Sequence, residues 1–184
     1  MLKMSQQLKE LISSPKKIVI TTHRGPDGDA MGSSLGLYHL LKQLGHTVSV
    51  ITPNEYASFL HWMPGNKEVV IYEGNEKSAD KITAEADIIF LLDFSDLRRI
   101  SPFTDSVSKS NATKIMIDHH QDPDRDIAEL IFSDTTACST AQLVYEVMDA
   151  MQMTTYLNKE IAECLYVGIM TDTGSFKYAS TTAK

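Results

Sequence analysis

Apolar residues recur along this chain in two alternating patterns, short continuous runs and longer stretches with helical spacing. The short runs are rich in Ile, Val and Leu and are bounded by polar residues, which predicts strands buried on both faces of a sheet. These runs are Ile18–Thr22, Thr47–Thr52, Val69–Tyr72, Ile88–Leu92, Ile115–Ile117 and Leu130–Phe132.

The longer stretches between these runs predict helices, because their apolar residues recur every three to four positions. They are Met1–Ser13, Ala30–Leu44, Tyr56–Met63, Glu76–Ala86, Thr136–Met151 and Asn158–Met170. The serine- and aspartate-rich segment Pro102–Asn111 is predicted to be a surface loop. This alternation is typical of an α/β fold with a doubly wound, mostly parallel sheet and helices on both faces.

Four glycines lie before, within and directly after the helical stretch Ala30–Leu44. Gly45 directly follows it and is expected to end the helix. Gly28, Gly32 and Gly36 resemble a phosphate-binding loop, but the Gly-Lys-Ser/Thr of a P-loop is missing. We therefore expect Gly32 and Gly36 to let the helix pack closely on the sheet.

The composition sets limits on the class of protein. A chain of 184 residues without an evident linker or repeat is expected to form one domain. The net charge of −7 argues against broad non-specific nucleic-acid binding, which needs a basic surface. A nucleotide substrate remains open, because bound divalent cations reverse the local field.

Cellular location is expected to be cytoplasmic. The N-terminal segment has no signal-peptide cleavage pattern, and the longest apolar run, Ile88–Leu92, is far too short to cross a membrane. Cys138 and Cys164 match no zinc or disulfide spacing and are expected to be buried thiols in helices, in a reducing compartment.

Polar residues stand directly after three of the predicted strands. His23 follows the first strand, Asp93 follows Ile88–Leu92, and Asp118-His119-His120 follows Ile115–Ile117. In open α/β sheets, ligands bind beyond the carboxyl ends of the strands. These residues are therefore expected to meet at one edge of the sheet.

Further carboxylates accompany them in the sequence. Asp27 and Asp29 lie shortly after His23, and Asp172 ends the last predicted helix. The candidate metal ligands are His23, Asp27, Asp29, Asp93, His119 and Asp172. Four carboxylates in one cleft repel one another, and two divalent cations would balance their charge.

The donor set also narrows the choice of metal. Mixed aspartate and histidine ligands without cysteine favour a first-row ion such as Mn²⁺, with Mg²⁺ and Co²⁺ as alternatives. Two such ions about 3.5–4 Å apart promote phosphoryl transfer without a serine or cysteine nucleophile.

Each residue taken singly has a simpler explanation. Asp27-Gly28 is a common turn signal, Asp29 has the chemistry of a helix N-cap, and adjacent histidines often lie on surfaces. Capping and turns do not explain why four strand- or helix-terminal segments all carry His or Asp. The joint pattern therefore favours a metal site.

Four segments of the chain resemble the motifs of the DHH phosphoesterase family, in the family's order. They are His23–Ser33, Asp93 after its strand, Asp118-His119-His120, and Gly168–Phe176 with its Thr171-Asp172-Thr173-Gly174 core. The resemblance covers nearly the whole chain and is greatest to the bacterial nanoRNase and pAp-phosphatase branch. Related branches include RecJ exonucleases, cyclic-di-AMP phosphodiesterases and family II inorganic pyrophosphatases.

The resemblance implies a role for each site residue. It places His23 and Asp27 on one metal ion and Asp29 and His119 on the other, with Asp93 and Asp172 bridging. It implies that Asp118 orients a histidine ring and that His120 faces the substrate phosphate as a donor or proton source. It also suggests Arg99 and Ser175 as substrate-binding residues.

The resemblance further implies a metal-dependent hydrolase acting on short oligoribonucleotides or on the 3′-phosphate of pAp. Hydrolysis of pyrophosphate or polyphosphate, of cyclic-di-AMP or pApA, and a non-catalytic nucleotide-binding module are the alternatives. Residues 1–184 would form the DHH catalytic domain. A C-terminal substrate domain of DHHA1 type is expected in the full-length protein and is expected to be missing from this chain. Assembly of the full-length protein into a homodimer is left open.

Overall fold

A single all-parallel sheet of six strands organises the protein, whose computed structural model describes residues 2–182. The strands are β1 (Lys17–Thr22), β2 (Thr47–Thr52), β3 (Val70–Ile71), β4 (Ile88–Leu92), β5 (Thr113–Asp118) and β6 (Leu130–Ser133). Their order is β3-β2-β1-β4-β5-β6, and every neighbouring pair is parallel. The order reverses between β1 and β4, which confirms the doubly wound prediction.

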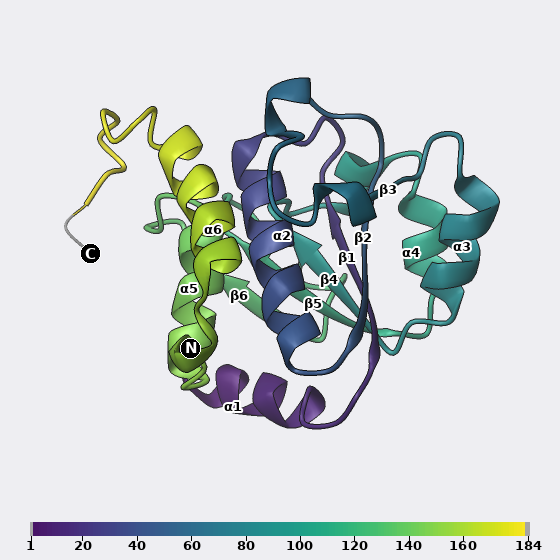
Figure 1. Ribbon diagram of the computed structural model, residues 1–184. Coiled ribbons are helices and arrows are strands. Elements are labelled where there is room, and N and C mark those ends of the chain that lie inside the picture. The colour runs from purple at the N-terminus through teal and green to yellow at the C-terminus, as the bar shows by residue number, and fades with distance from the viewer. Residues whose placement is uncertain (1, 183–184) are drawn as a thin grey trace.

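Helices cover both faces of this sheet (Figure 1). One face carries α1 (Leu2–Leu11), α2 (Gly28–Gln43), α5 (Thr140–Ala150) and α6 (Lys159–Asp172). The other carries the shorter helices α3 (Glu76–Ala84) and α4 (Thr104–Lys109). Met1, at the start of the first predicted helix, lies outside the described residues.

The central strands are apolar throughout because both of their faces are buried. On one face, Ile20, Phe90 and Ile117 join the larger core beneath α2, α5 and α6. The residues between them, such as Leu91 and Met116, point to the smaller core under α3 and α4. All five of these side chains are 0% exposed, so the continuous apolar runs have the cause that the sequence predicts.

Two segments differ from the sequence prediction. Pro102–Asn111 is not a loop throughout, because it contains the helix α4. Phe103 and Val107, four residues apart, are both buried and pack this helix against the sheet. Tyr56–Met63 forms only a short 3₁₀ turn at Ser58–Leu60 rather than a helix, with Tyr56, Leu60 and Met63 buried around it.

The helix predicted at Thr136–Met151 begins four residues later than expected, at Thr140. Ser139 has extended backbone and its hydroxyl oxygen accepts a hydrogen bond from Gln142 N at 3.0 Å, so it caps the helix. Cys138 therefore lies before the helix and is only partly buried, contrary to expectation. Cys164 is buried within α6, as predicted.

The glycines of α2 serve helix–helix packing rather than the helix–sheet packing expected from the sequence. A Cβ atom on Gly32 would lie 2.5 Å from the carbonyl oxygen of Cys164 and 2.7 Å from Gly168 N, both on α6. A Cβ atom on Gly36 would likewise collide with Leu165. Gly45 adopts φ +86° and ends the helix as predicted.

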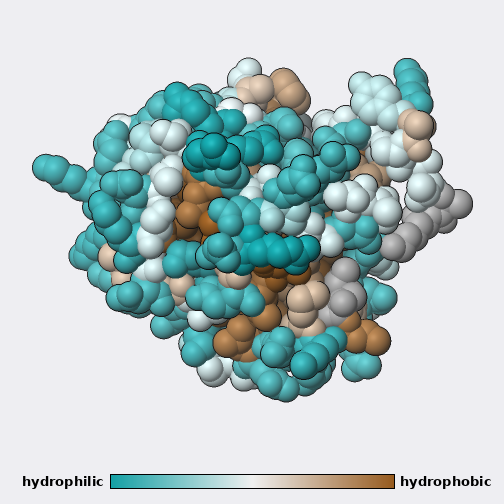
Figure 2. All heavy atoms as spheres, turned by 180° about the vertical axis from the view of Figure 1, so that it is seen from behind, coloured by the Kyte–Doolittle hydropathy of each residue, from teal (hydrophilic) through white to brown (hydrophobic). Residues whose placement is uncertain are grey.

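Polar side chains cover most of the rear surface, with hydrophobic patches showing between them (Figure 2). Among residues 2–182, no helix combines the length and apolar character that a membrane span requires.

His46 ties the beginnings of β1 and β2 together. Its ring is 4% exposed, and Nδ1 accepts a hydrogen bond from Lys16 N at 3.1 Å. Burial lowers the pKa of His46. A histidine whose pKa is lower in the folded than in the unfolded state stabilises the fold fully at pH values above its ordinary pKa of about 6.5. This stability is lost as the pH falls, because the unfolded state then binds the proton more readily.

We expect His46→Asn to keep the hydrogen-bond acceptor while removing this titration. The difference in Tm between wild type and variant should shrink as the pH is lowered from about 7.5 to about 5. Thermal unfolding of both proteins across this range measures it, and titrations elsewhere cancel in the difference. A Tm difference independent of pH would contradict the assignment.

Candidate metal centre

The predicted site residues converge at the carboxyl ends of the strands. His23 follows β1, Asp93 follows β4, and His119 follows β5, so they flank the point at which the strand order reverses. Parallel strands present their carboxyl ends at one edge, and such a switch point leaves a crevice there. The convergence expected from the sequence is therefore seen in the structure.

One group of possible ligands comprises His23, Asp27 and Asp93. His23 Nε2 lies 3.5 Å from Asp93 Oδ2 and 3.8 Å from Asp27 Oδ2. Asp27, not Asp29, caps α2: its Oδ1 accepts hydrogen bonds from the backbone N–H groups of Asp29 and Ala30 at 3.0 Å each. Capping uses one oxygen of Asp27, and the other remains on the side of His23.

A second group comprises Asp29, His119 and Asp172. His119 Nε2 lies 3.2 Å from Asp172 Oδ2 and 3.9 Å from Asp29 Oδ2. These residues come from β5, the C-terminal end of α6 and the first turn of α2. Sequence positions more than a hundred residues apart thus meet in one cluster.

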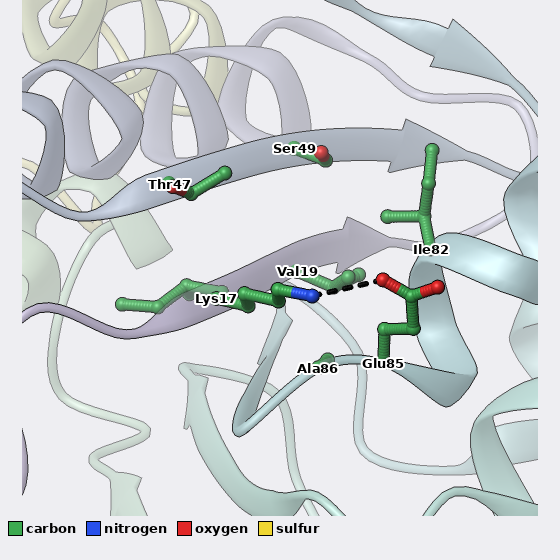
Figure 3. A pocket seen from close by; sticks show the side chains of 8 residues that line it. Lys17, Val19, Thr47, Ser49, Ile82, Glu85 and Ala86 are labelled. Atoms are coloured by element: carbon green, nitrogen blue, oxygen red, sulfur yellow. Dashed lines mark hydrogen bonds and ion pairs between the residues drawn. The ribbon is translucent and has the colours of Figure 1, made fainter.

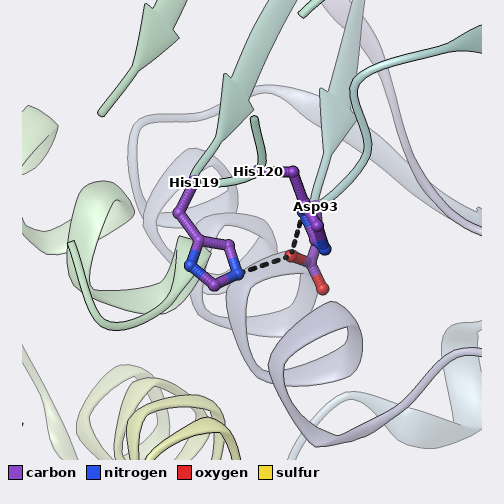
Figure 4. A group of neighbouring side chains, drawn as sticks. All are labelled: Asp93, His119 and His120. Atoms are coloured by element: carbon purple, nitrogen blue, oxygen red, sulfur yellow. Dashed lines mark ion pairs between the residues drawn. The ribbon is translucent and has the colours of Figure 1, made fainter. Parts of the chain in front are cut away.

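Asp93 connects the two groups. Its Oδ1 lies 3.7 Å from His119 Nε2 and 3.7 Å from His120 Nδ1 (Figure 4). Asp93 is 2% exposed and adopts φ +66°, in the left-handed region that few non-glycine residues occupy. Its backbone N–H donates to the carbonyl oxygen of Ile117 at 3.1 Å, which holds this conformation. Strained backbone of this kind is frequent at functional sites.

Asp29 is fully buried and is held by the N-terminus of α5. The backbone N–H groups of Thr140 and Ala141 donate to its two carboxylate oxygens at 2.6 and 2.9 Å. Gly168 on α6 makes room for this arrangement, since a Cβ atom there would lie 2.7 Å from Asp29 Oδ1. The absence of a side chain at Gly168 on α6 thus leaves space for the buried carboxylate of Asp29 between α2 and α5.

The electrostatics of the cluster reflect crowding of negative charge. Burial, and then the charge of Asp93, raise the pKa of Asp29 well above its usual range. Burial likewise raises the pKa of Asp172, although His119 partly offsets it. Burial alone would lower the pKa of His23, but its contacts with Asp93 and the Arg24 carbonyl raise it overall.

His120 completes a third group of possible ligands, with Asp93 and His119, and it also pairs with Asp118. Asp118 is 0% exposed, and its Oδ1 lies 2.8 Å from His120 Nδ1. This hydrogen bond raises the pKa of His120 and orients its ring. Because Asp118 occupies Nδ1, that nitrogen is poorly suited to bind a metal ion, and the imidazolium form is favoured.

The two residues suggested for substrate binding are both exposed. Arg99 is exposed in the 3₁₀ turn Leu97–Ile100, close enough to His120 for its charge to act on that pKa. Ser175 is exposed three residues after Asp172 and adopts φ +60°. Neither position tests a substrate-binding role.

The donor set suits divalent cations of the first transition row. Imidazole nitrogens and carboxylate oxygens surround Asp93, and no cysteine belongs to the ligand groups found among the described residues. Positive charge at these positions would relieve the repulsion that raises the aspartate pKa values.

A cavity of about 150 Å³ lies elsewhere, at the opposite edge of the sheet (Figure 3). It opens beside Lys17 and Thr47, the first residues of β1 and β2. Its charged side chains, Lys17 and Glu85, neutralise one another in an ion pair of 2.9 Å. The cavity offers no chemistry comparable to that of the aspartate–histidine cluster.

Comparison with known proteins defines the family to which this chain belongs. The chain belongs to the DHH family: residues 17–169 match the model of the "DHH family, N-terminal domain". It is 30% identical over 185 residues to the bifunctional oligoribonuclease and PAP phosphatase NrnA of Bacillus subtilis (strain 168), covering 98% of this chain and 54% of that protein. The chain thus spans about half the length of this curated relative.

Solved structures agree with the assignment. The crystal structure of an exopolyphosphatase-related protein from Bacteroides fragilis superposes with a TM-score of 0.97 at 43% identity, over 100% of this chain and 54% of that chain. The exonuclease RecJ bound to manganese superposes with a TM-score of 0.57 at 17% identity, over 93% of this chain and 42% of that chain. The RecJ likeness shows the shared fold alone.

Asp172→Asn should separate stability from metal binding. The raised pKa of Asp172 means that its ionised form costs stability at neutral pH, so the metal-free variant should unfold at the same Tm as wild type or a few degrees higher. Manganese ions should raise its Tm less than that of wild type. Thermal unfolding with EDTA or MnCl₂ tests this.

Asp149→Asn provides the matched control, since it removes the same charge from an exposed position on α5. It should respond to Mn²⁺ as wild type does. An undiminished manganese response in Asp172→Asn would remove Asp172 from the ligand set.

Gly168→Ala should damage both the fold and the centre. The added methyl group would lie 2.5 Å from Ala141 Cβ and 2.7 Å from Asp29 Oδ1. Overpacking of this kind costs about 1–3 kcal/mol, which lowers Tm by several degrees. Ala162→Ser, at an exposed position of the same helix, should leave Tm unchanged. Equal Tm values for Gly168→Ala and wild type would show that α6 can move away from its neighbours without cost, which would contradict the need for glycine at this position.

Proposed function

We propose that this protein is a metal-dependent phosphoesterase that hydrolyses short oligoribonucleotides and the 3′-phosphate of pAp. The observation that carries the proposal is the cluster of four aspartates and two histidines gathered around Asp93 at the switch point of the sheet. The similarity to the Bacillus subtilis oligoribonuclease and PAP phosphatase, over 98% of this chain, favours these substrates.

Two divalent ions, with Mn²⁺ as the preferred metal, are proposed for the two ligand groups. His23 and Asp27 would hold one ion and Asp29 and His119 the other, with Asp93 and Asp172 shared between them. When bound, the pair of ions supplies the positive charge that favours attack of water on a phosphoryl group. The central position of Asp93 supports its proposed bridging role.

His120 is proposed as the proton donor to the leaving oxygen. Its hydrogen bond to the buried Asp118 raises its pKa, which favours the protonated form of the ring that a proton donor requires. At 38% side-chain exposure it is more accessible than His23 or His119. Asp118 then acts by orienting this ring and stabilising its charged form.

Positive charge at the same edge supports an anionic substrate. All four arginines of the chain follow the carboxyl ends of β1, β4 or β5: Arg24, Arg98, Arg99 and Arg125. Arg24 and Arg98 form ion pairs with Glu73 and Asp96. The charge of Arg99 acts on His120, and we propose that Arg99 binds a substrate phosphate. Ser175, exposed after α6, is proposed as a second substrate-binding residue.

A substrate-binding domain of DHHA1 type is proposed as the partner of this catalytic domain. The chain spans 54% of the length of its Bacillus subtilis relative, which supports a further domain in the whole protein. The metal centre lies at an open edge of the sheet, and a second domain would shield it from water and strengthen its electrostatic interactions.

Hydrolysis of pyrophosphate or polyphosphate is the second candidate. The Bacteroides fragilis structure, 43% identical, belongs to a protein described as exopolyphosphatase-related. The same ligand groups would serve that reaction, so the two candidates differ in the substrate and not in the metal chemistry.

A direct assay separates these candidates. With Mn²⁺, the full-length protein that carries this chain should release mononucleotides from RNA of two to five nucleotides, or phosphate from pAp, faster than phosphate from pyrophosphate. Asp93→Ala should lower kcat/KM at least about 100-fold, because it removes the shared ligand. Asp149→Asn should retain activity.

Hydrolysis of pyrophosphate alone would replace the proposal with the second candidate. No hydrolysis of any of these substrates, although Mn²⁺ binds, would favour a non-catalytic nucleotide-binding module.

A further inference from the structure

Thr140 contacts carboxylates of both ligand groups. Its backbone N–H donates to Asp29 Oδ2 at 2.6 Å, and its hydroxyl donates to Asp93 Oδ1 at 2.9 Å. Thr140 is 0% exposed, so water cannot readily replace either interaction. Sequence reasoning did not single out this residue, because nothing in its position alone distinguishes it from an ordinary first residue of a helix.

The start of α5 explains why the backbone of Thr140 points at Asp29. The first N–H groups of a helix have no partner within the helix. Ser139 caps α5 through Gln142 N, which leaves the N–H groups of Thr140 and Ala141 to be satisfied by Asp29. The negative carboxylate also lies at the positive end of an 11-residue helix, where it is stabilised.

The hydroxyl of Thr140 determines how the Asp93 carboxylate is turned. With Oδ1 accepting from Thr140, Oδ2 lies 3.5 Å from His23 Nε2, on the side of the first ligand group. Oδ1 remains 3.7 Å from His119 Nε2, on the side of the second. One hydrogen bond therefore fixes which oxygen faces which group.

We infer that Thr140 is a positioning residue of the metal centre, holding Asp29 through its N–H and Asp93 through its hydroxyl. This inference rests on the proposed function, since it requires that the two groups bind metal ions. Hydrogen bonds that orient ligands raise metal affinity because the free site is already arranged for binding. Thr140 touches no substrate and acts through Asp29 and Asp93.

The test is the affinity of the purified full-length protein for Mn²⁺, measured by calorimetry after removal of metal with EDTA. Thr140→Val keeps the shape of the side chain and its backbone N–H but removes the hydroxyl donor. It should weaken Mn²⁺ binding by about 10- to 100-fold. Thr140→Ser retains the hydroxyl and should bind Mn²⁺ within about threefold of wild type.

Thr83→Val is the matched control. Thr83 is also 0% exposed, and its hydroxyl donates to the Ala79 carbonyl within α3, on the other face of the sheet. It undergoes the same chemical change, and its Mn²⁺ affinity should equal that of wild type. A similar loss in Thr83→Val and Thr140→Val would mean that general destabilisation causes it, which would overturn the inference.

The remaining outcomes also decide the question. Unchanged affinity in Thr140→Val, or equal impairment of Thr140→Ser, would overturn the positioning role while leaving the metal centre intact. Absence of Mn²⁺ binding by wild type would overturn the proposed function itself. If Thr140→Val does not fold, a crystal structure of the manganese-loaded wild type decides: the inference requires the Thr140 hydroxyl within hydrogen-bond distance of Asp93, and a hydroxyl turned elsewhere refutes it.

Discussion

The arrangement of this site depends on the mutual repulsion of its buried carboxylates. Asp29 and Asp93 are almost completely buried, and each has a carboxylate oxygen within 4 Å of His119 Nε2, at 3.9 and 3.7 Å. Asp172, at the end of α6, lies 3.2 Å from the same nitrogen. Unpaired charges of the same sign are costly in such surroundings. Imidazole rings, backbone N–H groups and a helix N-terminus compensate part of this negative charge. Two bound cations would compensate the remainder.

Parallel topology is what makes the crowding possible. The strands β1, β4 and β5 end side by side, so residues far apart in sequence reach the same edge. The N-terminal ends of α2 and α5 then approach from one face and bring N–H donors to Asp27 and Asp29. Close packing of α2 against α6 at glycines brings Asp172, at the end of α6, to within 3.2 Å of His119. A single arrangement of layers thus serves both the core and the centre.

Much of this arrangement could be predicted from the sequence because it follows from local patterns. Apolar runs locate the strands, and His23, Asp93 and His119 can be placed at one edge because each directly follows a strand. Contacts between distant helices leave no such local signal. The role of Gly32 depends on α6, and the link from Thr140 to Asp93 spans 47 positions. Likewise, the polar composition of α4 predicts a loop, and the helix is stabilised by the burial of Phe103 and Val107 against the sheet.

The central claim is that this aspartate–histidine cluster binds a pair of metal ions. Anomalous diffraction from a crystal grown with Mn²⁺ measures this most directly. The account predicts two peaks about 3.5–4 Å apart, one beside His23 and Asp27 and the other beside Asp29 and His119, with Asp93 between them. A single peak, no peak, or peaks outside this cluster would contradict it.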